Sequence, residues 1–170
     1  MNINEYQNYH ETKAHTSAEF PYNTYLCSIP LDFPGVPLHW HDELELVVIK
    51  RGQGFVSVDF DKRLVHSGDI IIIPPRCLHA IEQDDTFKME YENIIFKPDL
   101  LSSGANDLCM IQYIVPLLDG SLPIEYFLTP ALGSFEALSN CIRQIDLVCA
   151  DQTPGWQLAV KSSLFNFSFF

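Results

Sequence analysis

Short runs of hydrophobic residues, separated by glycine, proline and aspartate, fill the chain up to Phe96. Alternation with a period of two is typical of strands with one buried face, and continuous β-branched runs are typical of strands buried on both faces. The clearest continuous run is the four isoleucines of residues 70–73. A turn is expected at Lys50-Arg51-Gly52. The pattern predicts strands at residues 20–29, 38–49, 53–60, 63–66, 70–73, 78–83 and 87–96.

After Pro98 the spacing of the apolar positions changes. They recur at intervals of three and four across residues 130–150, and a further apolar segment covers residues 154–170, which predicts two helices. Residues 107–118 fit a shorter helix, and residues 123–128 fit one more strand. We therefore predict a mainly β fold, an antiparallel barrel of the jelly-roll type followed by a C-terminal α-helical hairpin.

The length of 170 residues suits one domain, which the pattern divides into three segments. Residues 1–19 are a polar N-terminal arm, residues 20–98 form the barrel, and residues 99–170 form the helical region. The arm carries scattered aromatic residues and two histidines, so it is either a frayed terminus or a lid over a pocket. A frayed terminus is the preferred interpretation.

Composition and charge limit the kind of partner. The formal net charge of −12 opposes phosphate groups, so these residues are expected to bind a small molecule or a protein and not DNA. Five cysteines without a C-x-x-C pair indicate a reducing compartment. The polar N-terminus resembles no signal peptide, and no apolar run is long enough to cross a bilayer. The expected location is cytoplasmic, without a membrane partner.

The candidate chemistry lies in His39, His41, Glu45 and His79. Side chains two residues apart on a strand share a face, so His39 and His41 point the same way, and Glu45 does too if the strand is unbroken. Three imidazoles and a carboxylate are a good ligand set for a divalent transition metal. The alternative is a hydrogen-bonded polar layer that contacts an effector or water.

These residues resemble the two motifs of the cupin superfamily. The first motif is H-x-H, three or four residues, E, six residues and G, which matches His39 to Gly52. The second is G, five residues, P-x-G, two residues, H, three residues and N, which matches Gly68 to Gln83 with Arg76 in place of the glycine and Gln83 in place of the asparagine. The resemblance implies a jelly-roll barrel, and in cupin enzymes these ligands hold zinc, nickel, iron or manganese.

A narrower resemblance is to the N-terminal effector-binding domain of AraC-type transcription regulators. It rests on the run from His39 to Leu46, on Gly68 to Pro75, and on the strand ending that leads into the helices. The resemblance implies a small-molecule effector, often a sugar, a homodimer formed through the helices, and no enzymatic activity. DNA contact is then expected only through a C-terminal domain beyond Phe170. The candidate effector-binding residues are His39, His41, Glu45, His79, Tyr22, Tyr25, Tyr91 and Asn93.

A stand-alone cupin metalloenzyme, such as a dioxygenase, isomerase or lyase, is the alternative function, because all four ligand types are retained. The aromatic cluster of residues 165–170 favours the regulator. Such an apolar end is expected either to pack against a partner or to continue into further chain.

Overall fold

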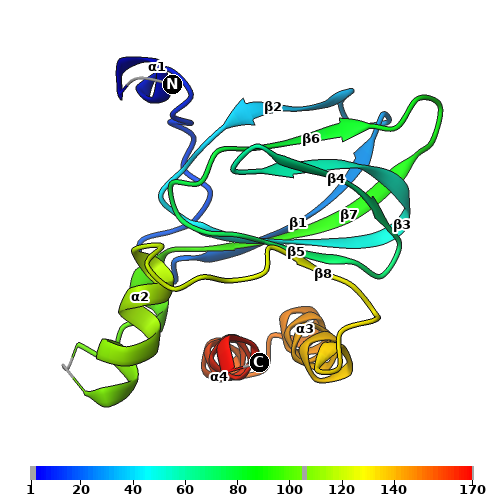
Figure 1. The fold of residues 1–170 in the computed structure, drawn as a ribbon. Helices are drawn as coiled ribbons and strands as arrows, with labels where there is room; N and C mark the ends of the chain where they lie inside the picture. The colour runs from blue at the N-terminus through cyan, green and yellow to red at the C-terminus, as the bar shows by residue number, and fades with distance from the viewer. Residues whose placement is uncertain (1–2, 105–106, 170) are drawn as a thin grey trace.

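The computed structural model describes residues 3–104 and 107–169, which form a barrel on one side and a layer of helices on the other (Figure 1). The last predicted aromatic residue, Phe170, lies outside the described residues. The elements in chain order are α1 (Ile3–Gln7), β1 (Tyr22–Ile29), β2 (Gly35–His39), β3 (Leu44–Val58), β4 (Asp61–His66), β5 (Ile70–Ile73), β6 (His79–Gln83), β7 (Met89–Phe96), η1 (Pro98–Leu101), η2 (Met110–Ile114), α2 (Val115–Leu118), β8 (Phe127–Leu128), α3 (Phe135–Asp151) and α4 (Trp156–Phe169).

Every strand pairing of the barrel is antiparallel, which confirms the predicted fold class. One sheet has the strand order β1-β7-β3-β5-β8. In the other sheet β6 lies between β2 and β3, and β4 pairs with the free side of β3. β3 is therefore the strand that both sheets share, and it closes the barrel along one edge.

The predicted turn at Lys50-Arg51-Gly52 is wrong, because β3 continues through it. The chain bends there without reversing, and the register against β7 shifts between Ile49 and Arg51. Gly52 has a φ of 78°, and a Cβ at this position would lie 1.8 Å from the carbonyl oxygen of Lys88. Only glycine tolerates both the left-handed backbone and this close approach. The bend turns the first half of β3 into one sheet and the second half into the other.

The predicted second strand, residues 38–49, is divided in the structure. β2 ends at His39, β3 begins at Leu44, and a short bend joins the two. The carbonyl oxygen of His41 accepts a hydrogen bond from the backbone of Arg76, 2.7 Å away, so the connecting segment is bound to the β5–β6 loop and not to a continuous ladder.

Alternating side chains of the larger sheet pack to two different sides. Ile70, Ile71 and Ile73 are buried as predicted and Ile72 is partly buried, with Ile71 and Ile73 inside the barrel and Ile70 against the helices. The interior core of the barrel is made of Ile29, Val47, Ile49, Val56, Val58, Val65, Ile71, Ile73, Ile81, Met89, Tyr91 and Phe127. On the opposite side of the sheet, Leu44, Leu46, Val48, Ile94 and Phe96 meet the helices.

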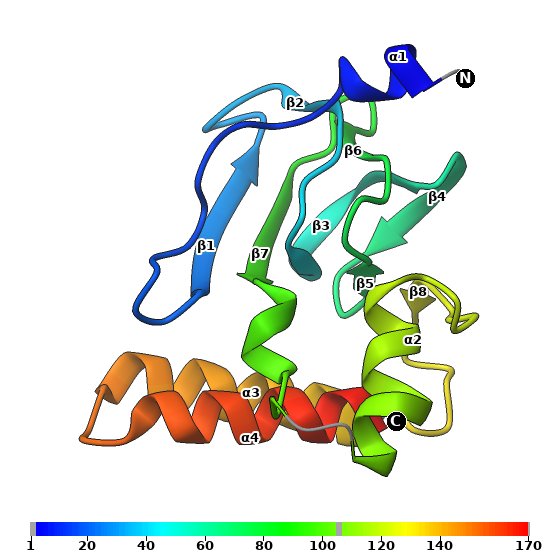
Figure 2. The ribbon, with the colours of Figure 1, turned by 90° about the vertical axis from the view of Figure 1, so that its left-hand side faces the viewer.

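The predicted helical hairpin is confirmed, and it lies across the outer side of the larger sheet (Figure 2). Its buried side chains include Leu138, Ile142 and Ile145 of α3 and Val160 and Leu164 of α4. The predicted helix at residues 107–118 is η2 followed by α2, and the predicted strand at 123–128 is reduced to β8, which pairs with β5. Within the described residues no helix combines the length and apolarity needed to cross a membrane.

A polar connection joins the barrel to α3 through this apolar layer. Lys50 Nζ lies 2.6 Å from Glu92 Oε2 and 3.1 Å from Asp146 Oδ2. The hydroxyl of Thr24 donates to the other oxygen of Glu92, at 2.8 Å. Glu92 is buried, so its charge requires these partners, and they fix the position of α3 relative to β3 and β7.

We expect the contact between α3 and the sheet to supply a large share of the stability. Replacing Ile142, which is 2% exposed, with alanine is expected to lower the free energy of unfolding by about 2–4 kcal/mol. The exposed Gln144 lies on the same helix, and Gln144→Ala is the matched control with an expected change within about 0.5 kcal/mol. Urea denaturation followed by circular dichroism measures both. Equal effects would contradict the packing described above.

Candidate functional site

A pocket of about 460 Å³ opens into one end of the barrel. Its wall comes from strands of both sheets and from the N-terminal arm, defined here as residues 3–19. Polar and charged side chains gather there, although the rest of the barrel interior is hydrophobic. The lining includes His39, His41, Glu45, His79, Tyr25, Tyr91, Asn93, Glu11, Lys13 and His15.

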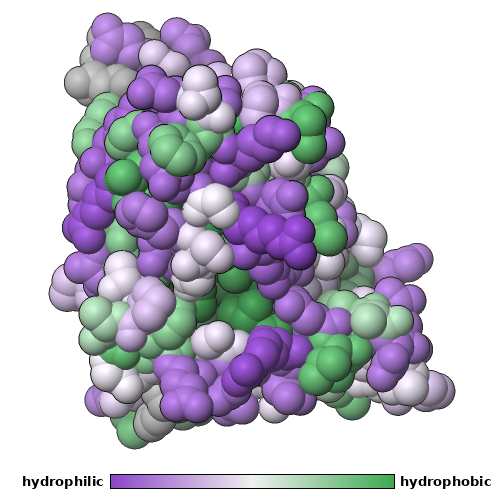
Figure 3. All heavy atoms as spheres, turned by 90° about the vertical axis from the view of Figure 1, so that its right-hand side faces the viewer, coloured by the Kyte–Doolittle hydropathy of each residue, from purple (hydrophilic) through white to green (hydrophobic). Residues whose placement is uncertain are grey.

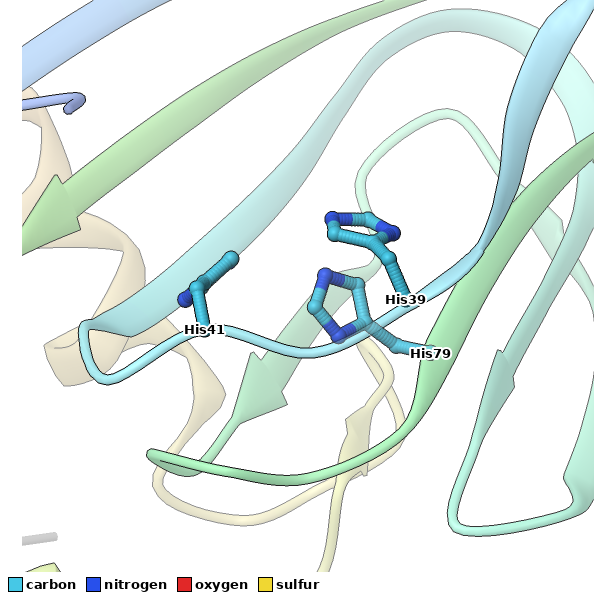
Figure 4. A group of neighbouring side chains, drawn as sticks. All are labelled: His39, His41 and His79. Carbon is cyan, nitrogen blue, oxygen red and sulfur yellow. The ribbon is translucent and has the colours of Figure 1, made fainter. Parts of the chain in front are cut away.

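Three imidazoles converge inside the pocket (Figure 4). His39 ends β2, His79 begins β6, and His41 lies on the bend before β3. The ligand atoms of these residues all lie within 4.8 Å of one another, and the ring centroids of His39 and His79 are 4.1 Å apart. Residues that are forty positions apart in the chain thus meet because β2 pairs with β6 in the smaller sheet.

The backbone fixes the orientation of each ring. His39 Nδ1 donates to the carbonyl oxygen of Pro37 at 2.9 Å, and His79 Nδ1 donates to that of Cys77 at 2.9 Å. His41 Nδ1 donates to the carbonyl oxygen of Glu43 at 3.2 Å. Since Nδ1 carries the proton in all three rings, Nε2 is the atom that each ring presents to the pocket. Metal-binding histidines are held in this way by their second nitrogen.

Glu45 lies beside two of the three imidazoles. Its Oε2 atom is 2.9 Å from His41 Nε2 and 3.4 Å from His79 Nε2. The strand is broken between His41 and Glu45, so the parity argument does not apply across it, yet Glu45 faces the interior through the alternation within β3. All four residues predicted from the cupin-like motifs are therefore brought into one pocket.

The charges in this cluster depend on each other. Burial and the neighbouring His79 lower the pKa of His39 to about 4, so His39 is a neutral imidazole near pH 7. Burial lowers the pKa of His41, but the hydrogen bond and charge of Glu45 outweigh this effect, and its pKa is raised. Burial raises the pKa of Glu45, but His41 and His79 outweigh it and hold that pKa well below its usual range. The site therefore keeps a buried carboxylate that needs a positive partner.

The donor set fits a divalent metal ion. Two ligands about 2.1 Å from a tetrahedral zinc ion are separated by about 3.4 Å. Glu45 Oε2 lies at this distance, 3.4 Å, from His79 Nε2, and it lies nearer to His41 Nε2, at the hydrogen-bond distance of 2.9 Å. The buried Nε2 atom of His79 has no hydrogen-bond partner within the described chain, which leaves its lone pair available. The Nε2 atom of His41 and the carboxylate of Glu45 both present lone pairs, so either a proton or a cation must lie between them.

The loop between β5 and β6 supports the cluster despite one departure from the motif. Arg76 occupies the position of the motif glycine and has a φ of 64°, the left-handed conformation for which glycine is suited. Its backbone N–H binds the carbonyl oxygen of His41, and its guanidinium lies 2.8 Å from Asp42. Arginine thus keeps the turn, and its side chain is held at the surface and not directed at the pocket.

Three of the four additional residues predicted to bind an effector line the pocket, namely Tyr25, Tyr91 and Asn93. The buried hydroxyl of Tyr91 lies beside the thiol of Cys27, and neither it nor Asn93 Oδ1 has a conventional hydrogen-bond partner among the described residues. Tyr22 does not line this pocket. It faces α3 from the other side of β1, where its hydroxyl is 3.6 Å from the thiol of Cys149. Strand alternation separates Tyr22 from Tyr25.

The sequence analysis missed residues of the N-terminal arm. Glu11, Lys13 and His15 line the pocket, so the lid interpretation describes the structure better than a frayed terminus does. Trp40 binds the arm, because its indole stacks between Tyr6 and His10 and its Nε1 donates to the carbonyl oxygen of Tyr6 at 2.8 Å. A signal for these pocket residues was present in the sequence, because histidine, tyrosine and glutamate residues are concentrated in this polar segment.

Comparisons with known proteins agree on the kind of domain. A family model described as AraC-like ligand binding domain matches residues 23–167. The chain is 32% identical over 159 residues to the uncharacterized HTH-type transcriptional regulator YdeC of Bacillus subtilis, covering 93% of this chain and 54% of YdeC. It is 26% identical over 72 residues to YbfI of the same organism, another uncharacterized HTH-type transcriptional regulator, covering 42% of this chain and 26% of YbfI.

The chain thus spans about half the length of YdeC and a smaller part of YbfI. Among solved structures, a cupin protein from Bacteroides fragilis is 22% identical with a TM-score of 0.42, over 61% of this chain and 80% of that protein.

Proposed function

The chain belongs to the family of AraC-like ligand binding domains, and we propose that it is the effector-sensing part of a transcription regulator. The effector is a small hydrophilic molecule, in our proposal a carbohydrate, bound inside the barrel. The observation that carries this proposal is a pocket in which several buried polar atoms, among them His79 Nε2, the Tyr91 hydroxyl and Asn93 Oδ1, lack hydrogen-bond partners within the described chain. Such atoms cost free energy when they are buried unpaired, and hydroxyl groups of a ligand would satisfy them.

We further propose that a divalent transition metal is bound by His39, His41, His79 and Glu45. Three imidazoles with fixed Nε2 atoms and one buried carboxylate support it. Zinc, nickel, iron and manganese all accept such ligands. The ion would act as a Lewis acid that attracts ligand oxygens. The residues of the chain orient the donors, neutralise the charge and keep the site apart from bulk water.

The regulatory role of the whole protein is also a proposal. Both relatives from Bacillus subtilis are named HTH-type regulators, and this chain covers only part of each. We propose that DNA is bound by a separate domain in the full protein, because the formal net charge of −12 on these 170 residues opposes phosphate groups. A cupin metalloenzyme remains the second candidate, and the histidine cluster is the observation that favours it.

The metal proposal predicts about one ion per chain in protein purified without an affinity tag, as measured by elemental analysis. His39→Ala is expected to lower the metal content severalfold, because it removes one donor near the mouth of the pocket without opening the core. His66→Ala is the matched control, since the side chain of His66 is 59% exposed and lies outside the pocket. If the unchanged chain is purified without a metal ion and its far-ultraviolet spectrum is that of a folded protein, the metal site is rejected.

The effector proposal predicts that a saccharide raises the melting temperature in a screen of pentoses, hexoses and their acids. A ligand at a hundred times its dissociation constant stabilises the folded state by about 2.7 kcal/mol. Tyr91→Phe removes a pocket hydroxyl and is expected to weaken the affinity for the saccharide found in the screen about tenfold. Tyr22→Phe is the control, because Tyr22 lies outside the pocket. If a screened compound is converted to a product and none raises the melting temperature, the metalloenzyme is favoured instead.

The predicted dimer also stays a proposal, and the outward side of the hairpin supports it. Leu147 of α3 is 59% exposed and Leu158 of α4 is 75% exposed, although the inward side of both helices is packed on the sheet. Light scattering is expected to give a dimer for the unchanged chain and a monomer for Leu158→Glu. Leu31→Glu is the control, because Leu31 is 70% exposed on the β1–β2 connection. A monomer at all concentrations would reject this surface as a dimer interface.

A further inference from the structure

Glu11 places a second carboxylate, after Glu45, on the side of the histidine cluster where the Nε2 atoms lie. It comes from the N-terminal arm, and its Oε2 atom lies 3.5 Å from His39 Nε2. The same oxygen is 2.8 Å from His15 Nε2, so His15 holds the carboxylate in position. Glu11 therefore directs its carboxyl group at His39 from the N-terminal arm.

The position of Glu11 is fixed by the residue between two of the metal-site histidines. Trp40 lies between His39 and His41, and its backbone carbonyl accepts a hydrogen bond from the N–H of Glu11 at 2.9 Å. The N–H of Trp40 in turn donates to the carbonyl oxygen of Tyr9 at 2.9 Å. A short parallel bridge between His10 and Trp40 accompanies these bonds. The arm is thus in register with the segment that carries the histidines.

Glu45 and Glu11 contact the Nε2 atoms of different histidines in the cluster. Glu45 contacts His41 and His79, whereas Glu11 contacts His39. Glu11 would be a fifth ligand beside the three imidazoles and Glu45, and the 3.5 Å separation between its Oε2 atom and His39 Nε2 is short enough for both atoms to bind one five-coordinate ion. Two carboxylates also neutralise a divalent cation that neutral imidazoles alone would leave charged in a partly buried site.

The N-terminal arm is also bound to β1, through residues that follow its contact with Trp40. The carbonyl oxygen of His15 accepts hydrogen bonds from Asn23 Nδ2 at 2.9 Å and from the hydroxyl of Tyr25 at 3.1 Å. Glu11 therefore lies on a span that is bound at both ends and crosses the pocket between them. A cation at this point adds a third attachment.

From this arrangement we propose that Glu11 is a ligand of the ion held by the histidine cluster, so that metal binding fixes the N-terminal arm across the pocket. The inference rests on the proposed metal site and extends it to a residue that the cupin-like motifs do not contain. It gives the ion a structural effect outside the barrel, because the ion then attaches the arm to the barrel at a third point.

The test compares Glu11→Gln with the unchanged chain and with Glu19→Gln, an exposed glutamate of the same arm. Calorimetric titration with zinc is expected to show affinity at least tenfold weaker for Glu11→Gln and unchanged for Glu19→Gln. The visible absorption spectrum of bound cobalt is expected to change only in Glu11→Gln, because it reports the ligands of the ion. His15→Gln is the second variant. It removes the imidazole that holds Glu11 in position and keeps the carboxylate of Glu11, so it separates the position of Glu11 from its role as a ligand.

Trypsin provides a readout of the arm itself, because Lys13 is the only lysine or arginine among residues 1–19. Zinc is expected to slow cleavage after Lys13 in the unchanged chain and in Glu19→Gln, and to have little effect in Glu11→Gln. Far-ultraviolet spectra of every variant check that the barrel is folded.

Two outcomes would overturn the inference while the metal site stands. In the first, zinc binds Glu11→Gln as tightly as the unchanged chain, while His39→Ala loses the ion. In the second, Glu11→Gln and His15→Gln weaken binding equally and both keep the cobalt spectrum of the unchanged chain, which would mean that Glu11 acts only through the shape of the arm. Failure of the unchanged chain to bind zinc or cobalt would instead reject the metal site itself, and Glu11 as its ligand with it.

Discussion

The whole molecule depends on a single strand that has to serve two sheets. β3 pairs with β7 and β5 along its first half and with β6 and β4 along its second half. The bend at Gly52 makes this possible, because no side chain fits against the carbonyl of Lys88 at that point. This strand contributes residues to the interior core and to the outer core under the helices, and it carries Glu45 of the pocket, so its alternation decides which side of the sheet each of these side chains faces.

The polar side chains inside the barrel are concentrated in the pocket, and the rest of the barrel interior is apolar. Burying imidazoles and carboxylates is costly unless each is paired, and the structure pairs them unequally. The three Nδ1 atoms are satisfied by backbone carbonyls, whereas the Nε2 atom of His79 and the hydroxyl of Tyr91 have no conventional partner in the described chain. This arrangement indicates a ligand site. The protein itself fixes the Nδ1 side of each ring, and it leaves polar atoms on the pocket side for a ligand to bind.

Two elements outside the barrel are tied to it by different forces. The hairpin of α3 and α4 is held mainly by apolar packing, with the Lys50–Glu92–Asp146 connection fixing its position. The N-terminal arm is held by Trp40, by backbone hydrogen bonds and by contacts of Glu11 and His15. The surface between the barrel and the helices is hollowed, and hydrophobic residues are visible within the hollow (Figure 3). The helical layer therefore does not cover the apolar side of the barrel completely.

The amino-acid sequence by itself determined the strands, the helical hairpin and the set of histidines, because each depends on spacing between near neighbours. The alternation that places Tyr25 inside the barrel and Tyr22 outside was also present in the sequence, and could have separated these two residues. The tertiary structure alone decided that residues 50–52 bend and do not reverse, and that Glu11 reaches His39. Both outcomes depend on partners distant in the chain, the carbonyl of Lys88 for the bend and the indole of Trp40 for the arm, and local patterns carry no information about such contacts.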